Sequence, residues 1–111
     1  MKIKIISDTT CDLPEQLLKE YQITLLPLHI TKGEESLLDG VQIMPSDIFS
    51  YVDAGGEICT TASINPQEYV DAFAAYRAAY DAVIVITIGS GFSSCYQNAC
   101  VAARQFEQVY V

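Results

Sequence analysis

The chain has 111 residues, the length of one domain, and half of them are hydrophobic. Its formal net charge of −8 and its six Lys and Arg residues argue against nucleic acid and anionic membrane surfaces as partners, since both require clustered positive charge. Four cysteines without a C-x-x-C pair, together with a single histidine, give no pattern typical of a metal site.

The beginning of the chain reads as a strand and not as a signal peptide, because its short apolar run breaks at once into polar residues. No window reaches the roughly 18 apolar residues that a membrane helix needs. We therefore expect a cytoplasmic protein with no membrane span and with reduced thiols.

Apolar runs and turn residues predict strands and helices that alternate along the chain. The expected elements are a strand at 2–6, a helix from Pro14 through Tyr21, a strand at 23–30, a short return strand at 36–40, a helix at 48–53, a loop at 57–65, a helix from Pro66 through Tyr76, a strand at 82–88, a helix at 94–108 and a last strand from Val109. Pro27 donates no ladder hydrogen bond, so its strand should be bulged there or lie at a sheet edge. Helices between strands imply parallel pairing. We expect a three-layer α/β/α fold with a mainly parallel sheet of about four strands.

The strand at 82–88 is almost entirely Val and Ile, so we expect a central strand that is buried on both faces. A small polar loop, 89–94, follows it, and Ser93 or Ser94 then caps the next helix. The polar loop at 7–11 also follows a strand directly. Both loops should therefore lie at the carboxyl edge of the sheet, where free N–H groups, hydroxyls and a helix dipole favour an anion.

Some enzyme motifs nearly match this loop. Residues 91–95 would form a hydrolase nucleophile elbow if Cys95 were glycine, but the only histidine, His29, lies on a distant predicted strand. Residues 89–94 resemble a dinucleotide-binding loop with its last glycine replaced. The alternative function is accordingly a small-molecule hydrolase or transferase that uses Ser93 or Cys95.

The hydroxyl residues of the loops have two explanations. Helix capping accounts for one hydroxyl per helix without any ligand. The doubled pairs at 60–61 and 93–94 supply hydroxyls beyond those that caps would use. Asp8 either closes its own turn, which is the commoner role of aspartate, or takes part in the chemistry of a site.

Several segments, in the same order, resemble the motifs of the DegV family. They are Ser-Asp-Thr-Thr-Cys-Asp-Leu-Pro at 7–14, Leu-Pro-Leu at 26–28, Asp-Gly at 39–40, Thr-Thr-Ala-Ser at 60–63, Glu-Tyr at 68–69, and the serine-rich stretch at 88–99. The resemblance covers the whole chain, and it implies that residues 1–111 are an N-terminal α/β domain, with the family's second domain expected to be absent. Gly89, Ser94 and Cys95 depart from the pattern, where the family usually has Ser, Gly and Thr.

The resemblance implies a non-catalytic domain that binds a long-chain fatty acid, with no cofactor and no metal. The family's carboxylate ligands map to Thr61 and Ser93, and the acyl chain lies in an apolar tunnel of the first domain. Secondary candidates for the head group are Thr60, Ser90, Ser94 and Asp8.

The resemblance also implies partners for the chain. Some members of the family are the acyl-binding subunit of a bacterial fatty-acid kinase, in which a separate ATP-binding subunit supplies the phosphoryl transfer. The face that the second domain would cover is expected to allow self-association.

Overall fold

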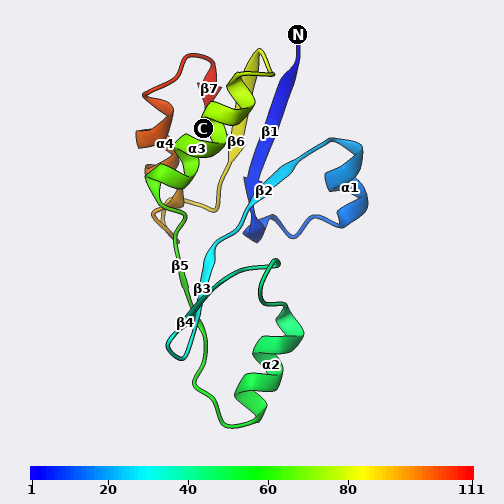
Figure 1. Cartoon of the computed structure of the whole chain (residues 1–111), viewed down its shortest axis with the longest axis vertical. Helices are drawn as coiled ribbons and strands as arrows, with labels where there is room; N and C mark the ends of the chain where they lie inside the picture. The colour runs from blue at the N-terminus through cyan, green and yellow to red at the C-terminus, as the bar shows by residue number, and fades with distance from the viewer.

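Four parallel strands form the larger sheet of the computed structural model, which describes all 111 residues (Figure 1). In spatial order the strands are β2 (Thr24–Leu26), β1 (Ile3–Asp8), β6 (Ala82–Ile86) and β7 (Val109–Tyr110). β1 and β6 pair in register from Ile3 opposite Ala82 to Ser7 opposite Ile86. Their β-branched residues suit the centre of a sheet. The α/β class and the parallel four-stranded sheet are confirmed.

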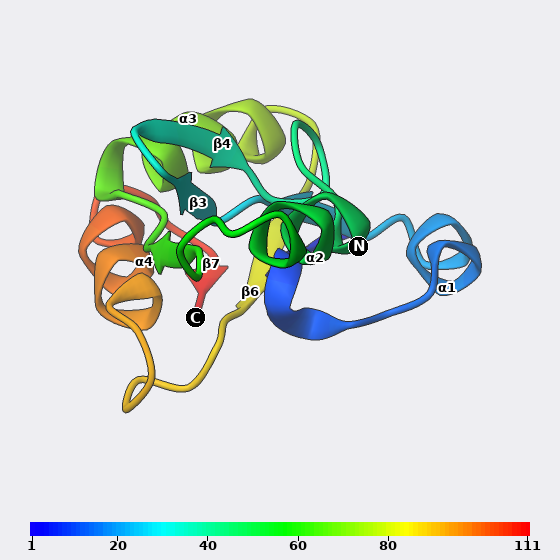
Figure 2. The same ribbon diagram turned by 90° about the horizontal axis from the view of Figure 1, so that it is seen from below.

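Helices cover the two faces of this sheet unequally. α3 (Pro66–Arg77) packs against α4 (Cys95–Ala103) on one face, whereas α1 (Glu15–Glu20) lies on the other side of β1 (Figure 2). In the sheet, β2 lies on one side of β1 and β6 and β7 lie on the other. Because crossovers between parallel strands are right-handed, helices that connect strands in opposite directions across the sheet lie on opposite faces. The result is a three-layer arrangement whose third layer is a single six-residue helix.

Asn65 begins α3 as its N-cap. Its side chain accepts a hydrogen bond of 2.8 Å from the backbone N–H of Glu68, whose carboxylate accepts from the N–H of Asn65 at 3.3 Å. Pro66 occupies the first helical position, where a missing N–H costs nothing. This reciprocal capping fixes where the chain turns from the small sheet into α3.

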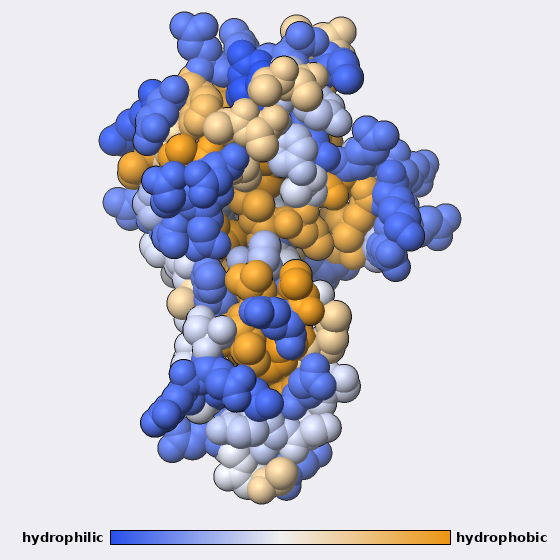
Figure 3. Space-filling model, in the orientation of Figure 1, coloured by the Kyte–Doolittle hydropathy of each residue, from blue (hydrophilic) through white to orange (hydrophobic).

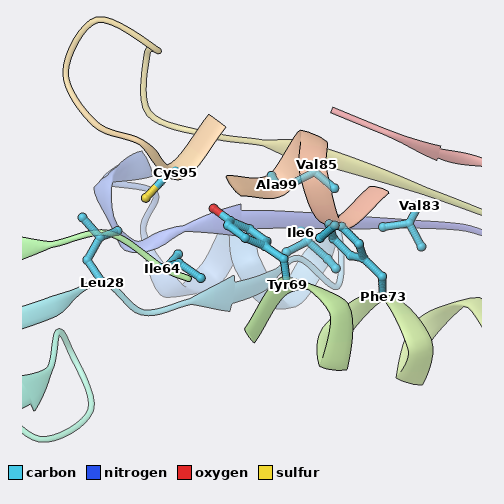
Figure 4. Close-up of a cluster of buried hydrophobic side chains, with 10 residues drawn as sticks. Ile6, Leu28, Ile64, Tyr69, Phe73, Val83, Val85, Cys95 and Ala99 are labelled. Carbon is cyan, nitrogen blue, oxygen red and sulfur yellow. The ribbon is translucent and has the colours of Figure 1, made fainter. Parts of the chain in front are cut away.

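The main core fills the space between the larger sheet and α3 and α4 (Figure 4). Its ten buried residues are Ile6, Leu28, Ile64, Tyr69, Phe73, Val83, Val85, Cys95, Ala99 and Ala102. The ring of Phe73 lies 5.8 Å from that of Tyr69 and 6.0 Å from that of Phe106, centroid to centroid. Such aromatic contacts add to the stability that burial alone provides.

The opposite face of the sheet is largely bare, which corrects the expectation that the 82–88 strand is buried on both faces. β6 ends at Ile86 and alternates, with Val83 and Val85 buried but Ile84 39% and Ile86 55% exposed. α1, with six residues and none of them buried, covers this face only in part. A run of Val and Ile predicts apolar faces, but it does not reveal whether a further layer covers both of them.

The predicted strand at 23–30 is divided between two sheets. β2 ends at Leu26, Pro27 interrupts the ladder, and β3 (His29–Lys32) belongs to a second sheet. That sheet is antiparallel and places β3 between β4 (Glu35–Leu38) and β5 (Thr60–Ala62).

β5 lies inside the segment 57–65 that the sequence predicts to be a loop. Its three residues are exposed and rich in hydroxyls, so only their pairing with β3 reveals a strand. The predicted helix at 94–108 also ends early, at Ala103.

The second sheet and α2 (Pro45–Asp53) form one end of an elongated molecule that measures 50 × 29 × 23 Å (Figure 1). Hydrophobic residues gather at the waist between the two sheets, as Figure 3 shows. His29 of β3 and Glu68 of α3 tie the two ends together, with 2.9 Å between the imidazole Nε2 and a carboxylate oxygen.

The core predicts that two phenylalanines contribute very differently to the free energy of unfolding. Phe73→Ala should lower the free energy of unfolding by about 3–5 kcal/mol, because it leaves a cavity between the helices and the sheet. Phe49→Ala, at a side chain that is 68% exposed on α2, should change it by less than about 0.5 kcal/mol. Urea unfolding followed by circular dichroism measures both; equal losses would contradict the assignment of the core.

Candidate functional site

Asp8 organises the two polar loops at the carboxyl edge of the larger sheet. Asp8 is the last residue of β1 and is only 2% exposed. One carboxylate oxygen accepts from the backbone N–H and the hydroxyl of Thr10, with 3.0 Å to the nitrogen, and the other accepts from the N–H of Ile88 at 2.8 Å. Asp8 thus joins the loop after β1 to the loop after β6.

Three serines, which we call the serine cluster, come together across 30 residues of sequence. The Oγ atoms of Ser63 and Ser93 lie 2.9 Å apart, and the hydroxyl of Ser94 donates to Ser63 Oγ at 2.7 Å. Ser63 follows β5 of the small sheet, whereas Ser93 and Ser94 precede α4. The cluster therefore joins a segment from each sheet into one polar surface.

Ser63 is a site residue that the sequence does not single out. The hydroxyl run at 60–63 is the available signal, but it does not indicate which member contacts the other loop. Thr60 and Thr61 lie on β5 with exposed side chains. Thr61 precedes Ser63 by two residues, the spacing at which side chains of an extended chain lie on the same side.

The hydroxyls before α4 are not used as ordinary caps. Ser94 occupies the N-cap position, as predicted, but its side chain makes no capping hydrogen bond. The N–H of Cys95 donates to Ser93 Oγ instead, at 3.3 Å. Capping alone does not explain these serines, and the start of α4 keeps backbone N–H groups and a favourable dipole for an anion.

Two open hollows flank this edge of the sheet. The first, of about 420 Å³, is lined by Ser90, Ser93 and Ser94 together with residues of α4. The second, of about 460 Å³, lies between the loops that Asp8 joins and has an apolar wall of Ile86, Ile88 and Phe92. The structure thus brings Ser90, Ser93 and Ser94 to one hollow, with Asp8 on the other.

The polar groups of this surface are uncharged apart from Asp8. None of the six Lys and Arg residues lies in the segments 60–63 and 87–94. Hydroxyls and N–H groups can hold an anion by hydrogen bonds alone, and they do so without the desolvation cost of a buried cation.

No base lies against a nucleophile in this region. Ser93 has the hydroxyl of Ser63 and the thiol of Cys95 as its side-chain neighbours, and the only histidine is paired with Glu68. Cys95 is fully buried. The alternative of a hydrolase or transferase finds no support in this geometry.

Two further observations concern metals and membranes. Nowhere do three or more His, Cys, Asp and Glu side chains gather as metal ligands would. None of the helices combines the length and the hydrophobicity that a bilayer span requires.

A parallel α/β domain that gathers neutral donors where strands end and a helix begins has the features of an anion-binding domain. The chain belongs to the DegV family: the family model, described as an uncharacterised protein of that family, matches residues 2–111. A DegV domain-containing protein of Clostridium perfringens is 39% identical over 106 residues, which are 96% of this chain and 38% of that protein.

Solved structures show the same fold. A fatty-acid-binding DegV family protein from Thermus thermophilus superposes with a TM-score of 0.91 at 26% identity, over 100% of this chain and 40% of its own. DegV from Bacillus subtilis, described as a fatty acid binding protein, gives a TM-score of 0.90 at 26% identity, over 100% and 39%. The chain therefore spans about two fifths of the length of these relatives.

The hydrogen bonds of Asp8 predict that Asp8→Asn destabilises the protein by about 1–3 kcal/mol. Both carboxylate oxygens face donors, so an amide would turn its own NH₂ group toward one of them. Asp12→Asn is the control, because Asp12 is exposed and its left-handed backbone (φ 52°) suits asparagine. Chemical denaturation measures the free energy of unfolding of both variants. Equal values for Asp8→Asn and Asp12→Asn would contradict the role given to Asp8.

Proposed function

We propose that this chain is a fatty-acid-binding domain whose serine cluster and β5 hold the carboxylate of a long-chain fatty acid. The observation that carries the proposal is the direct contact of Ser63 with Ser93, which sets the hydroxyl-bearing β5 beside the start of α4. The description of two structural relatives as fatty-acid-binding proteins supports the same ligand.

Thr61 and Ser93 would donate the principal hydrogen bonds to the carboxylate. Thr61 lies in the small sheet and Ser93 in the loop that follows the larger one, so a ligand with two acceptor oxygens would bridge the two. A hydrogen bond to a charged group contributes about 1.5–3 kcal/mol. Thr60, Ser90 and Ser94 are close in sequence to these two residues and would supply secondary contacts.

The acyl chain needs an apolar surface that starts near the head group. Ile86, Ile88 and Phe92 offer such a surface in the hollow beside the serine-rich loop. Phe92 is 86% exposed, so ligand burial there would remove a large apolar side chain from water. Each methylene that becomes buried contributes about 0.8 kcal/mol, which makes a long chain the main source of affinity. The tunnel itself would be completed by this surface together with further protein.

The proposed role is binding and presentation, not catalysis. The geometry supplies donors for a carboxylate but no base and nucleophile pair. If the bound acid is phosphorylated, we propose that the phosphoryl group comes from a separate ATP-binding subunit, with this domain presenting the carboxylate.

Ligand extraction tests the proposal. Solvent extraction of the purified protein followed by mass spectrometry should release long-chain fatty acid. Thr61→Val and Ser93→Ala should each weaken fatty-acid binding at least about tenfold, which corresponds to about 1.4 kcal/mol of lost head-group binding. Titration with a fluorescent fatty acid measures the affinity.

Thr31→Val and Ser50→Ala are the matched controls, since both residues are exposed and lie in β3 and α2. They should leave affinity unchanged. A protein that carries no fatty acid and binds none on titration would refute the proposal. Unchanged affinity in both Thr61→Val and Ser93→Ala would refute the assignment of the head-group site.

Thiol labelling separates binding from nucleophilic catalysis. Iodoacetamide should modify Cys95 more slowly than the partly exposed Cys11 and Cys59, because Cys95 is buried. Mass spectrometry of peptides from a time course gives the rates. Labelling of Cys95 faster than the other two would favour an activated thiolate instead.

A further inference from the structure

The hydroxyl of Tyr69 is a buried polar group without a hydrogen-bond partner. Tyr69 lies on α3, is 1% exposed, and packs in the main core among apolar side chains. A buried unpaired hydroxyl costs about 1–3 kcal/mol, and phenylalanine would fill the same space without that cost. An exception of this kind calls for an explanation from the rest of the site.

The Tyr69 hydroxyl points toward Cys95, as Figure 4 shows. Burial raises the pKa of Tyr69 far above its ordinary value, and the neighbouring Cys95 thiol raises it further. The phenol therefore stays protonated at any ordinary pH, and its O–H is available as a donor.

Cys95 links this hydroxyl to the serine cluster. The thiol is fully buried, and the hydroxyl of Ser93 donates to its sulfur at 3.3 Å. Tyr69, Cys95 and Ser93 thus form a line of polar groups from the core to the surface where the carboxylate is proposed to bind.

The directions of these hydrogen bonds matter for an anion. Ser93 Oγ donates inward to Cys95 Sγ and Ser94 Oγ donates to Ser63 Oγ, while either hydroxyl can donate in the contact between Ser63 and Ser93. A carboxylate accepts only, so it requires the proton of Ser93 to point outward. That rotation takes the donor away from the sulfur of Cys95, and it leaves Ser93 Oγ free to accept a further proton beside the Cys95 N–H that donates to it at 3.3 Å.

We propose that Tyr69 and Cys95 are positioning residues that turn Ser93 toward an anionic head group. In the bound arrangement the Tyr69 O–H donates to the sulfur, the Cys95 S–H donates to Ser93 Oγ, and the Ser93 O–H donates to the carboxylate. No covalent bond forms or breaks: the hydroxyls of Ser93 and Tyr69 turn, and the Cys95 side chain turns about χ1 to bring its sulfur within hydrogen-bonding reach of Tyr69 Oη. This inference rests on the proposed fatty-acid binding and adds to it the two residues that orient the hydroxyl of Ser93.

The arrangement selects for the chemistry of the head group. A carboxylate has no proton to donate, so its binding gains the full benefit of the reversed hydrogen bonds. A fatty alcohol can donate its own hydroxyl proton to Ser93, so it can bind while Ser93 still donates inward to Cys95. Tyr69 and Cys95 should therefore affect the acid and not the alcohol.

The test compares hexadecanoic acid with hexadecanol on the wild type, Tyr69→Phe, Cys95→Ala and Cys95→Ser. Tyr69→Phe and Cys95→Ala should weaken binding of the acid about threefold to tenfold and leave binding of the alcohol unchanged. Cys95→Ser should retain acid binding, because a hydroxyl also donates and accepts. Tyr69→Phe should be as stable as the wild type or more stable. Calorimetry gives the affinities, and near-ultraviolet circular dichroism verifies the fold.

Three results would overturn the inference. If the wild type binds no acid, the proposed function fails together with it. If Ser93→Ala loses acid binding while Tyr69→Phe and Cys95→Ala keep it, only this inference fails. Equal weakening of acid and alcohol would indicate a purely structural role for the two residues. If Tyr69→Phe does not fold, Cys95→Ala decides, since it leaves the aromatic ring in place.

Discussion

A hydrogen bond between two serine hydroxyls connects the two halves of this molecule at its most polar edge. Ser63 belongs to the chain that leaves the small sheet, and Ser93 belongs to the loop that leaves the larger one. The Asn98 side chain supports this junction by donating to the carbonyl of Ile64 at 2.9 Å. Together with the contact of Ser94 with Ser63, these bonds fix the hydroxyls of β5 relative to the start of α4.

The hydrophobic core and the polar edge meet at one residue. Cys95 begins α4, packs among core side chains, and accepts a hydrogen bond from Ser93. Its small size allows α4 to approach the sheet closely, and its sulfur gives the cluster a weakly polar neighbour in an apolar setting. The Cys95 side chain therefore takes part both in the packing of the core and in the hydrogen bonds of the serine cluster.

The sequence predicts what depends on neighbours along the chain. The β-branched run of β6 and the serine-rich loop carry local signals, and both lie where expected. Contacts between distant segments carry no such signal. Nothing in residues 57–65 indicates that β5 pairs with β3, and so Ser63 is not distinguishable from its hydroxyl neighbours.

The break at Pro27 has a mechanical consequence. Two short connections lead out of the small sheet, residues 27–28 to β2 of the larger sheet and residues 63–65 to α3. Ser63 lies within the second connection, whereas Thr61 lies in β5 of the small sheet. The position of Thr61 relative to Ser93 is therefore set by the angle of the small sheet, which the buried Leu28 and Ile64 of the two connections and the contact of His29 with Glu68 hold in place.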